Sequence, residues 1–470
     1  MINKKLFILI FILLFTGYFS INYLIGKDKF LNLNSLLNNE QKQLIKKYIF
    51  PHKFISQQKQ QILRQKQQIS QQQQQTSEIY QLLLPYLPDI ELRIKEEGKD
   101  IKIIEEDFKI SNNKTLKKYK LVESFYYGIL KILPGTGYVD FHQNNLFVLS
   151  SRGILAYTKN ISDEKYFKQI KNNINDFIGI KQFSKFRWFS LKDIFIYKDK
   201  IFISYTEEVR EDCWNTSVIY GNINYESIKF EKLFSPKECV HSKDNIDKEF
   251  NAHSSGGRII SFDDNHILLS VGEYKSRYLA QNKESVNGKI IKININNFDY
   301  EIISMGHRNP QGLYFDKEKN FILETEHGPQ GGDEINLIEV DKINKDKTLN
   351  YGWAIVSAGE HYGGKSEVNK KKYEKYPLHK SHSEYGFIEP LKSFVPSIGI
   401  SEITKIGENR YAVSSMPNKS LYFFKLNSEK KIINLERVEV FERVRDLKFN
   451  DNKLYLFLED TASIGVISLN

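Results

Sequence analysis

Short runs of alternating or β-branched apolar residues fill the chain over residues 119–470. Examples are LFVLSS, IFISYT, HILLSVG and KLYLFLE, and turns rich in Asn, Asp, Gly and Lys separate them. About twenty such runs occur, and no helical period persists across them. A single β-sandwich does not reach this size, whereas a propeller, in which four-stranded blades repeat around a central axis, does. The pattern therefore predicts an all-β propeller, and six blades would use about 24 strands.

Residues 1–30 have a different pattern. Positions 6–25 are apolar apart from Thr16, Ser20 and Asn22, which is long enough for one helix to cross a hydrocarbon core. Two lysines precede this stretch, and no clear small-residue cleavage motif follows it. The pattern predicts an uncleaved transmembrane helix that anchors the chain, with a cleaved signal peptide as the alternative.

Residues 31–118 begin with a glutamine-rich tract, as in QQKQQILRQKQQISQQQQQ. Ile55, Ile62 and Ile69 recur at every seventh position, but lysines occupy the other seam position of a coiled coil. We expect an exposed helical stalk that self-associates loosely, or alternatively a disordered polar tract. The charged stretch that follows, up to residue 118, is typical of a linker.

The net charge of +10 is concentrated near the N-terminus. Residues 1–120 hold 20 Lys+Arg and 11 Asp+Glu, a balance of 20 − 11 = +9, so the rest of the chain carries +10 − 9 = +1. A large β domain that is almost neutral does not offer the basic face that nucleic acid requires. We therefore expect no nucleic-acid partner and assign the basic excess to solvated faces close to a membrane.

The chain has two cysteines, Cys213 and Cys239, which flank one segment. Such a local pair is most simply a disulfide in a domain outside the cytosol, and the alternative is two free buried thiols. Because the predicted anchor favours an oxidising compartment, we expect a disulfide and a β domain that faces the periplasm or the extracellular side.

Several ordered motifs follow one another in the second half of the chain. They are RNPQG at Arg308–Gly312, EHGP at Glu326–Pro329, GDEIN at Gly332–Asn336, NYGW at Asn350–Trp353 and RVRD at Arg443–Asp446. Together they resemble the glucose/sorbosone dehydrogenase family, the quinoprotein aldose sugar dehydrogenases. The resemblance covers the chain from about residue 121 to its end, and it implies a six-bladed β-propeller.

The resemblance also implies a cofactor, pyrroloquinoline quinone (PQQ), bound with a calcium ion on one face of the propeller. PQQ carries three carboxylates, and guanidinium groups suit carboxylates because they offer fixed paired donors. Arg443 and Arg445 are two apart on a strand and would bind these carboxylates. Arg308 and Asn309 would donate to the quinone oxygens and polarise the carbon that accepts hydride.

The same resemblance assigns the metal ligands. Calcium takes oxygen ligands, including backbone carbonyls. In the family the Gly and Pro of the GP turn supply them, which corresponds to Gly328 and Pro329. For any one of these site residues taken alone, a purely structural role between blades is the alternative.

The predicted catalytic base lies in the segment NAHSSGGRIISF. The family places a His just before a Gly-Gly-Arg strand start and an acidic residue further along, which here are His253 and Glu273. A neutral imidazole takes the proton of a sugar's anomeric hydroxyl as hydride leaves. His253 lies one residue further from Arg258 than is usual in the family, and a bulge would absorb the difference. The alternative is a polar loop histidine at the blade rim.

One further position departs from the family. A lysine that reaches the cofactor is common there, and the corresponding place here holds Pro417, so Lys419 is the candidate replacement.

These observations predict a membrane-anchored quinoprotein oxidoreductase that oxidises an aldose-type sugar. The alternative is a non-catalytic propeller that acts as a binding or scaffold module on a membrane stalk. A calcium-dependent hydrolase is a third possibility, although the motifs do not supply its carboxylate and Asn ligands.

Overall fold

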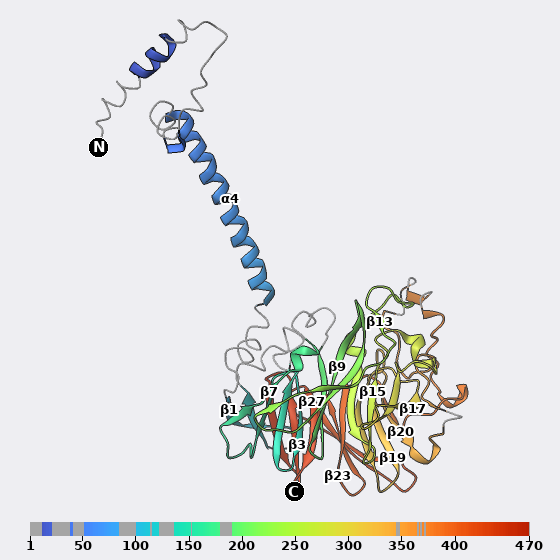
Figure 1. Cartoon of the computed structure of the whole chain (residues 1–470). Coiled ribbons are helices and arrows are strands. Elements are labelled where there is room, and N and C mark those ends of the chain that lie inside the picture. The colour runs from blue at the N-terminus through green and yellow to red at the C-terminus, as the bar shows by residue number, and fades with distance from the viewer. Residues whose placement is uncertain are drawn as a thin grey trace. The chain divides into compact units, whose positions relative to one another are not determined.

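A computed structural model describes residues 12–20, 38–40, 51–83, 100–112, 115–121, 136–151, 153–178, 190–344, 348–363, 366, 369–370 and 373–469. The chain divides into two compact units, Met1–Leu84 and Pro85–Asn470. The first unit is helical where it is described, and the second holds all of the strands (Figure 1).

The helix α4, Pro51–Leu83, covers the glutamine-rich tract. It confirms the predicted helix, because the tract has good helix formers and no interior Gly or Pro. Ile55, Ile62 and Ile69 are each about half exposed along it, at 51%, 51% and 52%. Self-association through this stripe stays a prediction.

Residues 12–20 are helical as well. Among the residues that the structure describes, no helix is long and apolar enough to span a membrane. Most of the predicted anchor lies outside the described residues, so the anchor stays a prediction.

The described residues of the second unit form six sheets. The largest runs β27 (Val444–Asn450), β28 (Lys453–Leu458), β29 (Ser463–Ser468), β2 (Thr115–Leu121), β1 (Ile101–Lys109), β6 (Tyr166–Gln169), β5 (Leu155–Thr158), β4 (Asn145–Ser150) and β3 (Gly137–His142). The next holds β12 (Glu231–Phe234), β10 (Cys213–Asn222), β9 (Lys200–Arg210) and β8 (Leu191–Tyr197), with β13 (Val240–His241) also on β10.

The remaining sheets follow in chain order. One holds β14 (Gly256–Ser261), β15 (His266–Val271), β16 (Lys289–Asn294), β17 (Tyr300–Met305) and β21 (Leu349–Asn350). Another holds β18 (Pro310–Asp316), β19 (Phe321–Glu326), β20 (Asp333–Glu339) and β22 (Lys392–Phe394). The last large one holds β23 (Ile400–Gly407), β24 (Arg410–Ser415), β25 (Ser420–Leu426) and β26 (Ile432–Glu439), and a small parallel pair joins β7 (Lys171–Asn172) to β11 (Ser227–Ile228).

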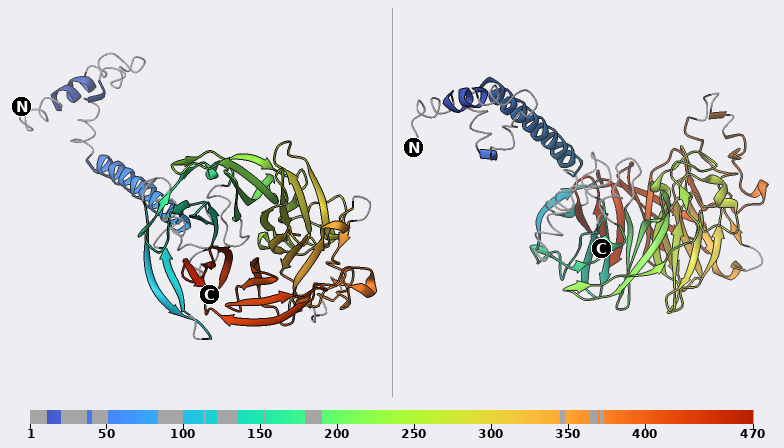
Figure 2. Two further views of the ribbon diagram at one scale, coloured as in Figure 1. Left: turned by 90° about the horizontal axis from the view of Figure 1, so that it is seen from below. Right: turned by 45° about the horizontal axis from the view of Figure 1, so that its top comes forward.

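The innermost strands close a ring. In the described residues, β3, β8, β14, β18, β23 and β27 each pack against the next, and β27 packs against β3. Figure 2 shows the strands arranged around this centre. The arrangement is propeller-like and confirms the expected all-β domain.

The ring is fastened by pairing the two ends of the domain. Strand β2 pairs antiparallel with the C-terminal strand β29, from Lys117 opposite Val466 to Lys120 opposite Ser463. Strand β1 pairs with β2 and also with β6, which makes one continuous sheet across the junction. The ladder covers sheet edges that would otherwise be open.

The expected linker up to residue 118 is therefore wrong in its last part, because β1 and β2 belong to the β domain. The strand signal was an alternation hidden among charges: Ile101 and Ile103 are buried while Lys102 and Ile104 are exposed. A two-residue period of this kind buries one face of a hairpin and leaves the other in water.

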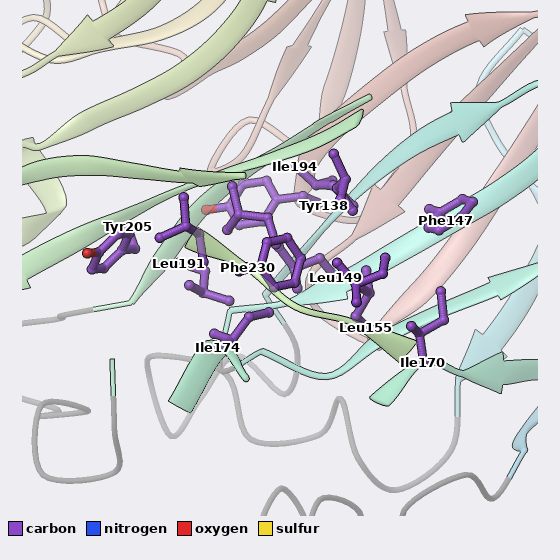
Figure 3. Close-up of a cluster of buried hydrophobic side chains, with 14 of the residues drawn as sticks. Tyr138, Phe147, Leu149, Leu155, Ile170, Ile174, Leu191, Ile194, Tyr205 and Phe230 are labelled. Atoms are coloured by element: carbon purple, nitrogen blue, oxygen red, sulfur yellow. The ribbon is translucent and has the colours of Figure 1, made fainter. Parts of the chain in front are cut away.

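Hydrophobic cores fill the spaces between adjacent sheets. The cluster in Figure 3 joins Tyr138, Phe147 and Leu149 of the β3–β5 region to Leu191 and Ile194 of β8. All of these side chains are buried, so each sheet is held on both faces by its neighbours.

The structure confirms the disulfide between Cys213 and Cys239, which are 26 residues apart. Cys213 begins β10, and its neighbour Trp214 is buried against Val240 and Ala252. The disulfide therefore joins the segment after β12 to strand β10. The start of β10 packs next to the turn that carries His253.

Candidate active site

A cavity of about 200 Å³ lies where the inner strands meet the loops on one face of the ring. It brings together four of the predicted site residues: His253, Asn309, Arg443 and Arg445. Segments far apart in the sequence supply them, from the turn before β14, the start of β18 and the start of β27. Further residues that line the cavity are Thr136, Tyr138, Lys192, Gly256, Arg258, Gln311, His327, Ser401, Met416, Pro417 and Glu459.

His253 lies in a short 3₁₀ turn, Ala252–Ser254, immediately before β14. Its backbone N–H donates to the side chain of Asn251 at 2.8 Å, which caps the turn. Burial lowers the pKa of His253 well below its usual value, and the charges of Lys192 and Arg445 lower it further. The imidazole is therefore neutral at neutral pH, the form that a general base needs.

Two glycines after this turn give the chain its path into the cavity. Gly256 has φ +63°, and a Cβ there would lie 2.8 Å from the Ser270 carbonyl oxygen. Gly257 has φ +121°, and a Cβ there would lie 2.4 Å from Cβ of Lys192. Glycine is required at both positions by the positive φ, and also by the close approach of β15 at Gly256 and of β8 at Gly257.

Lys192, on β8, was not predicted from the sequence. Its Nζ donates to the Ala252 carbonyl oxygen at 3.0 Å, next to His253. Burial and the nearby charge of Arg445 lower the pKa of Lys192 to about 7. The available signal was the charged pair Lys192–Asp193 inside the apolar run WFSLKDIFIY, because charges inside a buried strand need a specific reason.

Arg443 and Arg445 share one buried carboxylate, that of Glu459. Arg443 Nε donates to it at 2.8 Å, and Arg445 donates through Nη2 at 2.8 Å and Nε at 3.1 Å. Thr136 donates to the same carboxylate at 2.7 Å. Burial alone would raise the pKa of Glu459, but Arg445 and Arg443 outweigh it and lower the pKa to about 2. The two guanidinium groups are thus fixed in place and together keep a net positive charge.

Arg308 does not line the cavity, although its neighbour Asn309 does. The Arg308 guanidinium donates from Nη1 to the carbonyl oxygens of His327 at 2.8 Å and Gly328 at 2.6 Å, and it lies over the Trp353 ring. Asn309 accepts the Gly256 N–H at 3.1 Å through its side-chain oxygen. In this structure Arg308 therefore holds the EHGP turn in place. Asn309 connects the start of β18 to Gly256, just after the turn that carries His253.

The carbonyls expected to bind calcium are engaged by protein donors. The Gly328 carbonyl accepts from Arg308, and the Pro329 carbonyl lies 3.4 Å from the Ser397 hydroxyl. Calcium binds oxygen at about 2.3–2.6 Å, so an ion on Gly328 would lie against a guanidinium group. The turn as it stands does not fit calcium. Its acidic residue Asp333 instead accepts the backbone N–H groups of the segment leading into β23, at 3.0, 2.6 and 3.0 Å.

Two other expected residues lie outside the cavity lining. Glu273 is buried, and burial raises its pKa against the opposing charges of Arg277 and Arg308. Its role in orienting His253 stays a prediction. Lys419 pairs with Asp460 at 2.8 Å in a turn after Pro417, so Lys192, and not Lys419, supplies a lysine to the cavity.

The donor set of the cavity fits a planar polycarboxylate. Lys192, Arg443 and Arg445 supply positive charge, and Glu459 is the one carboxylate among the lining residues. Amide groups of Asn309 and Gln311 are available for carbonyl or quinone oxygens. PQQ, with three carboxylates and an ortho-quinone, carries the groups that such cationic and amide side chains would bind.

A propeller-like domain with a cationic cavity and a buried neutral histidine is the arrangement expected of the propeller oxidoreductases that act on sugars. Residues 189–467 match the glucose/sorbosone dehydrogenase family, and the chain belongs to this family.

Relatives of the chain include sugar dehydrogenases. Aldose sugar dehydrogenase YliI of Escherichia coli is 24% identical over 294 residues, which are 57% of this chain and 72% of the relative. An uncharacterized protein of Synechocystis is 29% identical over 223 residues, 41% of this chain and half the length of that relative. The structure of the PQQ-bound aldose sugar dehydrogenase from Streptomyces coelicolor shares the fold, with a TM-score of 0.50 and 17% identity over 69% of this chain and 90% of that chain.

Proposed function

We propose that this chain is a PQQ-dependent dehydrogenase that oxidises the anomeric carbon of an aldose-type sugar to a lactone. The observation that carries the proposal is the cavity that holds His253 beside Lys192, Arg443 and Arg445. When bound there, PQQ supplies an ortho-quinone that accepts hydride from the sugar carbon. Membership of a sugar dehydrogenase family supports the same reaction.

The residues of this chain would divide the work between binding and proton transfer. Arg443, Arg445 and Lys192 would bind the cofactor carboxylates through charge-assisted hydrogen bonds. His253 would accept the proton of the anomeric hydroxyl while the C–H bond breaks, so that the carbonyl of the lactone forms without a charged intermediate. The burial of His253 keeps it neutral and ready to accept that proton.

Reconstitution tests the proposal directly. The full chain is purified, mixed with PQQ, and followed for reduction of a redox dye across a panel of aldoses, with PQQ affinity measured by calorimetry. We expect PQQ to bind and at least one aldose to reduce the dye. A second set of samples also contains calcium. It tests whether calcium is needed, given that Arg308 already donates to the Gly328 carbonyl. If neither heat of binding nor dye reduction is observed, the non-catalytic module replaces the dehydrogenase.

We also propose that the chain is membrane-anchored, with the β domain on the periplasmic or extracellular side. The apolar positions 6–25 and the Cys213–Cys239 disulfide support this location. After cell fractionation we expect the chain in the membrane pellet, with its cysteines protected from a thiol reagent until a reductant is added. Recovery in the cytosol with two reactive thiols would contradict the proposal.

A further inference from the structure

A second polar cluster lies away from the cavity, on one face of the sheet that contains β19 and β20. Glu324 and Glu326 are two residues apart on β19 and therefore share a face. Asn336 of β20 lies directly opposite Glu324, and Glu334 lies opposite Glu326. His307, from the segment after β17, faces them, and the side chains of His307, Glu324 and Asn336 have no exposed surface.

The cluster is held by close contacts. His307 Nδ1 lies 3.4 Å from a carboxylate oxygen of Glu326 and 3.8 Å from one of Glu324. Asn336 Nδ2 donates to both carboxylates at 3.0 Å. The backbone N–H of Arg308 donates to the other oxygen of Glu326 at 2.5 Å.

The cluster holds more acidic groups than basic groups. Within the described part of the chain, the ion pairs of Glu324 and Glu326 involve His307 alone. In addition, Oε1 of Glu324 and Oδ1 of Asn336 are buried without a hydrogen-bond partner among the described residues. Such groups are costly to bury unless a donor or a cation satisfies them. A cation bound at this crowded face would satisfy the buried carboxylate oxygen of Glu324.

We propose that His307, Glu324 and Glu326 bind a divalent transition-metal ion. One ligand atom from each of these residues can be chosen so that all three lie within 4.8 Å of one another. One imidazole nitrogen with two carboxylates suits ions such as Zn²⁺ or Mn²⁺ better than Ca²⁺, which prefers an all-oxygen set.

The surroundings have the features of a metal-ligand shell. Nε2 of His307 lies 2.8 Å from the Ser304 hydroxyl, so that Nδ1 is left for the ion. The His307 ring also stacks on the Tyr351 ring, with 4.9 Å between the ring centroids, and this contact fixes the plane of the imidazole. Asn336 and the Arg308 N–H orient the carboxylates. The ion would cross-link the segment after β17 to β19, and this role is independent of PQQ and of the proposed oxidation.

Metal analysis of the purified full chain tests the assignment. After exhaustive dialysis we expect about one equivalent of Zn²⁺ or Mn²⁺ per chain by mass spectrometry. Protein stripped by a chelator should melt at a lower temperature and recover on addition of Zn²⁺ or Mn²⁺. Glu324→Gln should lose the metal and the thermal response, because the amide removes a charge but keeps the volume. Glu339→Gln, at the partly exposed end of β20, is the matched control and should retain both.

Three results would overturn the assignment. They are the absence of bound metal in the wild type together with no uptake by the stripped protein, equal metal content in wild type and Glu324→Gln, and selective retention of calcium. If Glu324→Gln does not fold, uptake by the stripped wild type decides the question alone.

Discussion

Replacing Arg258 with methionine is expected to remove a large part of the folding free energy of the β domain. Arg258 is 3% exposed at the centre of the ring. Its Nη1 lies 2.5 Å from Asp193 and 2.9 Å from Asp446, and its Nε pairs with Glu402. Those carboxylates come from β8, β27 and β23, so one guanidinium joins four inner strands.

The size of the effect follows from the charges left behind. Removing one partner of a buried ion pair costs about 3–5 kcal/mol, and here three carboxylates lose the same partner. Whole domains are stable by only about 5–15 kcal/mol, so the variant is expected to be barely folded. Urea unfolding measures the difference. Arg437→Met is the control, because Arg437 pairs with Glu439 at the surface, where a pair contributes about 0–1 kcal/mol.

The pH dependence gives this prediction a second readout. Burial, opposed by Arg258, raises the pKa of Asp193 to about 7 and that of Glu402 to about 8. Acids with raised folded pKa values contribute stability that is full below their unfolded pKa and is lost as pH rises through about 7 to 8. Without Arg258 the pKa values of these acids would rise further, so the deficit of the variant should be nearly constant below about pH 7 and grow as the pH rises above it. A deficit under about 1 kcal/mol, or one that is constant with pH, would contradict the argument.

The fold was predictable where the sequence repeats a physical pattern. Apolar alternation from residue 119 onward marks the strands of the inner ring. The hairpin of β1 and β2 was missed because its apolar positions are interrupted by Glu105, Glu106 and Asp107. Their pairing with β29 and β6 is also non-local, and no local signal in the sequence specifies such partners.

The site was predictable in part for the same reason. The motif residues Asn309, Arg443 and Arg445 line the cavity, because each lies at or beside the start of an inner strand; their binding of a cofactor stays a prediction. Motifs cannot say which way a long side chain turns, and Arg308 turns toward the Gly328 carbonyl, away from the cavity. The sequence marks Lys192 as a charge inside an apolar run, but only the fold shows that it lines the cavity, where its Cβ packs against Gly257.

Replacing His253 with asparagine is expected to lower kcat by about 10²–10⁴-fold while PQQ affinity changes little. The imidazole lines the cavity, and its neutral form is favoured by burial, Lys192 and Arg445. Asparagine keeps much of the volume and a hydrogen-bonding group but cannot accept the proton. Stopped-flow dye reduction measures the rate, and calorimetry measures the affinity. His266→Asn, on the partly exposed His266–Asp263 pair, is the control and should match the wild type.

The position of the acid limb in the pH–rate profile separates a base from a structural histidine. Because the pKa of His253 lies well below its usual value, kcat/KM should stay constant through the pH range in which a free imidazole titrates and fall only below that range. Lys192→Met removes the cation that most disfavours the imidazolium ion, so the acid limb should move to higher pH. The same variant should weaken PQQ binding, since it removes a cation from the cavity. An unchanged acid limb in Lys192→Met, together with normal turnover in His253→Asn, would mean that another group accepts the proton.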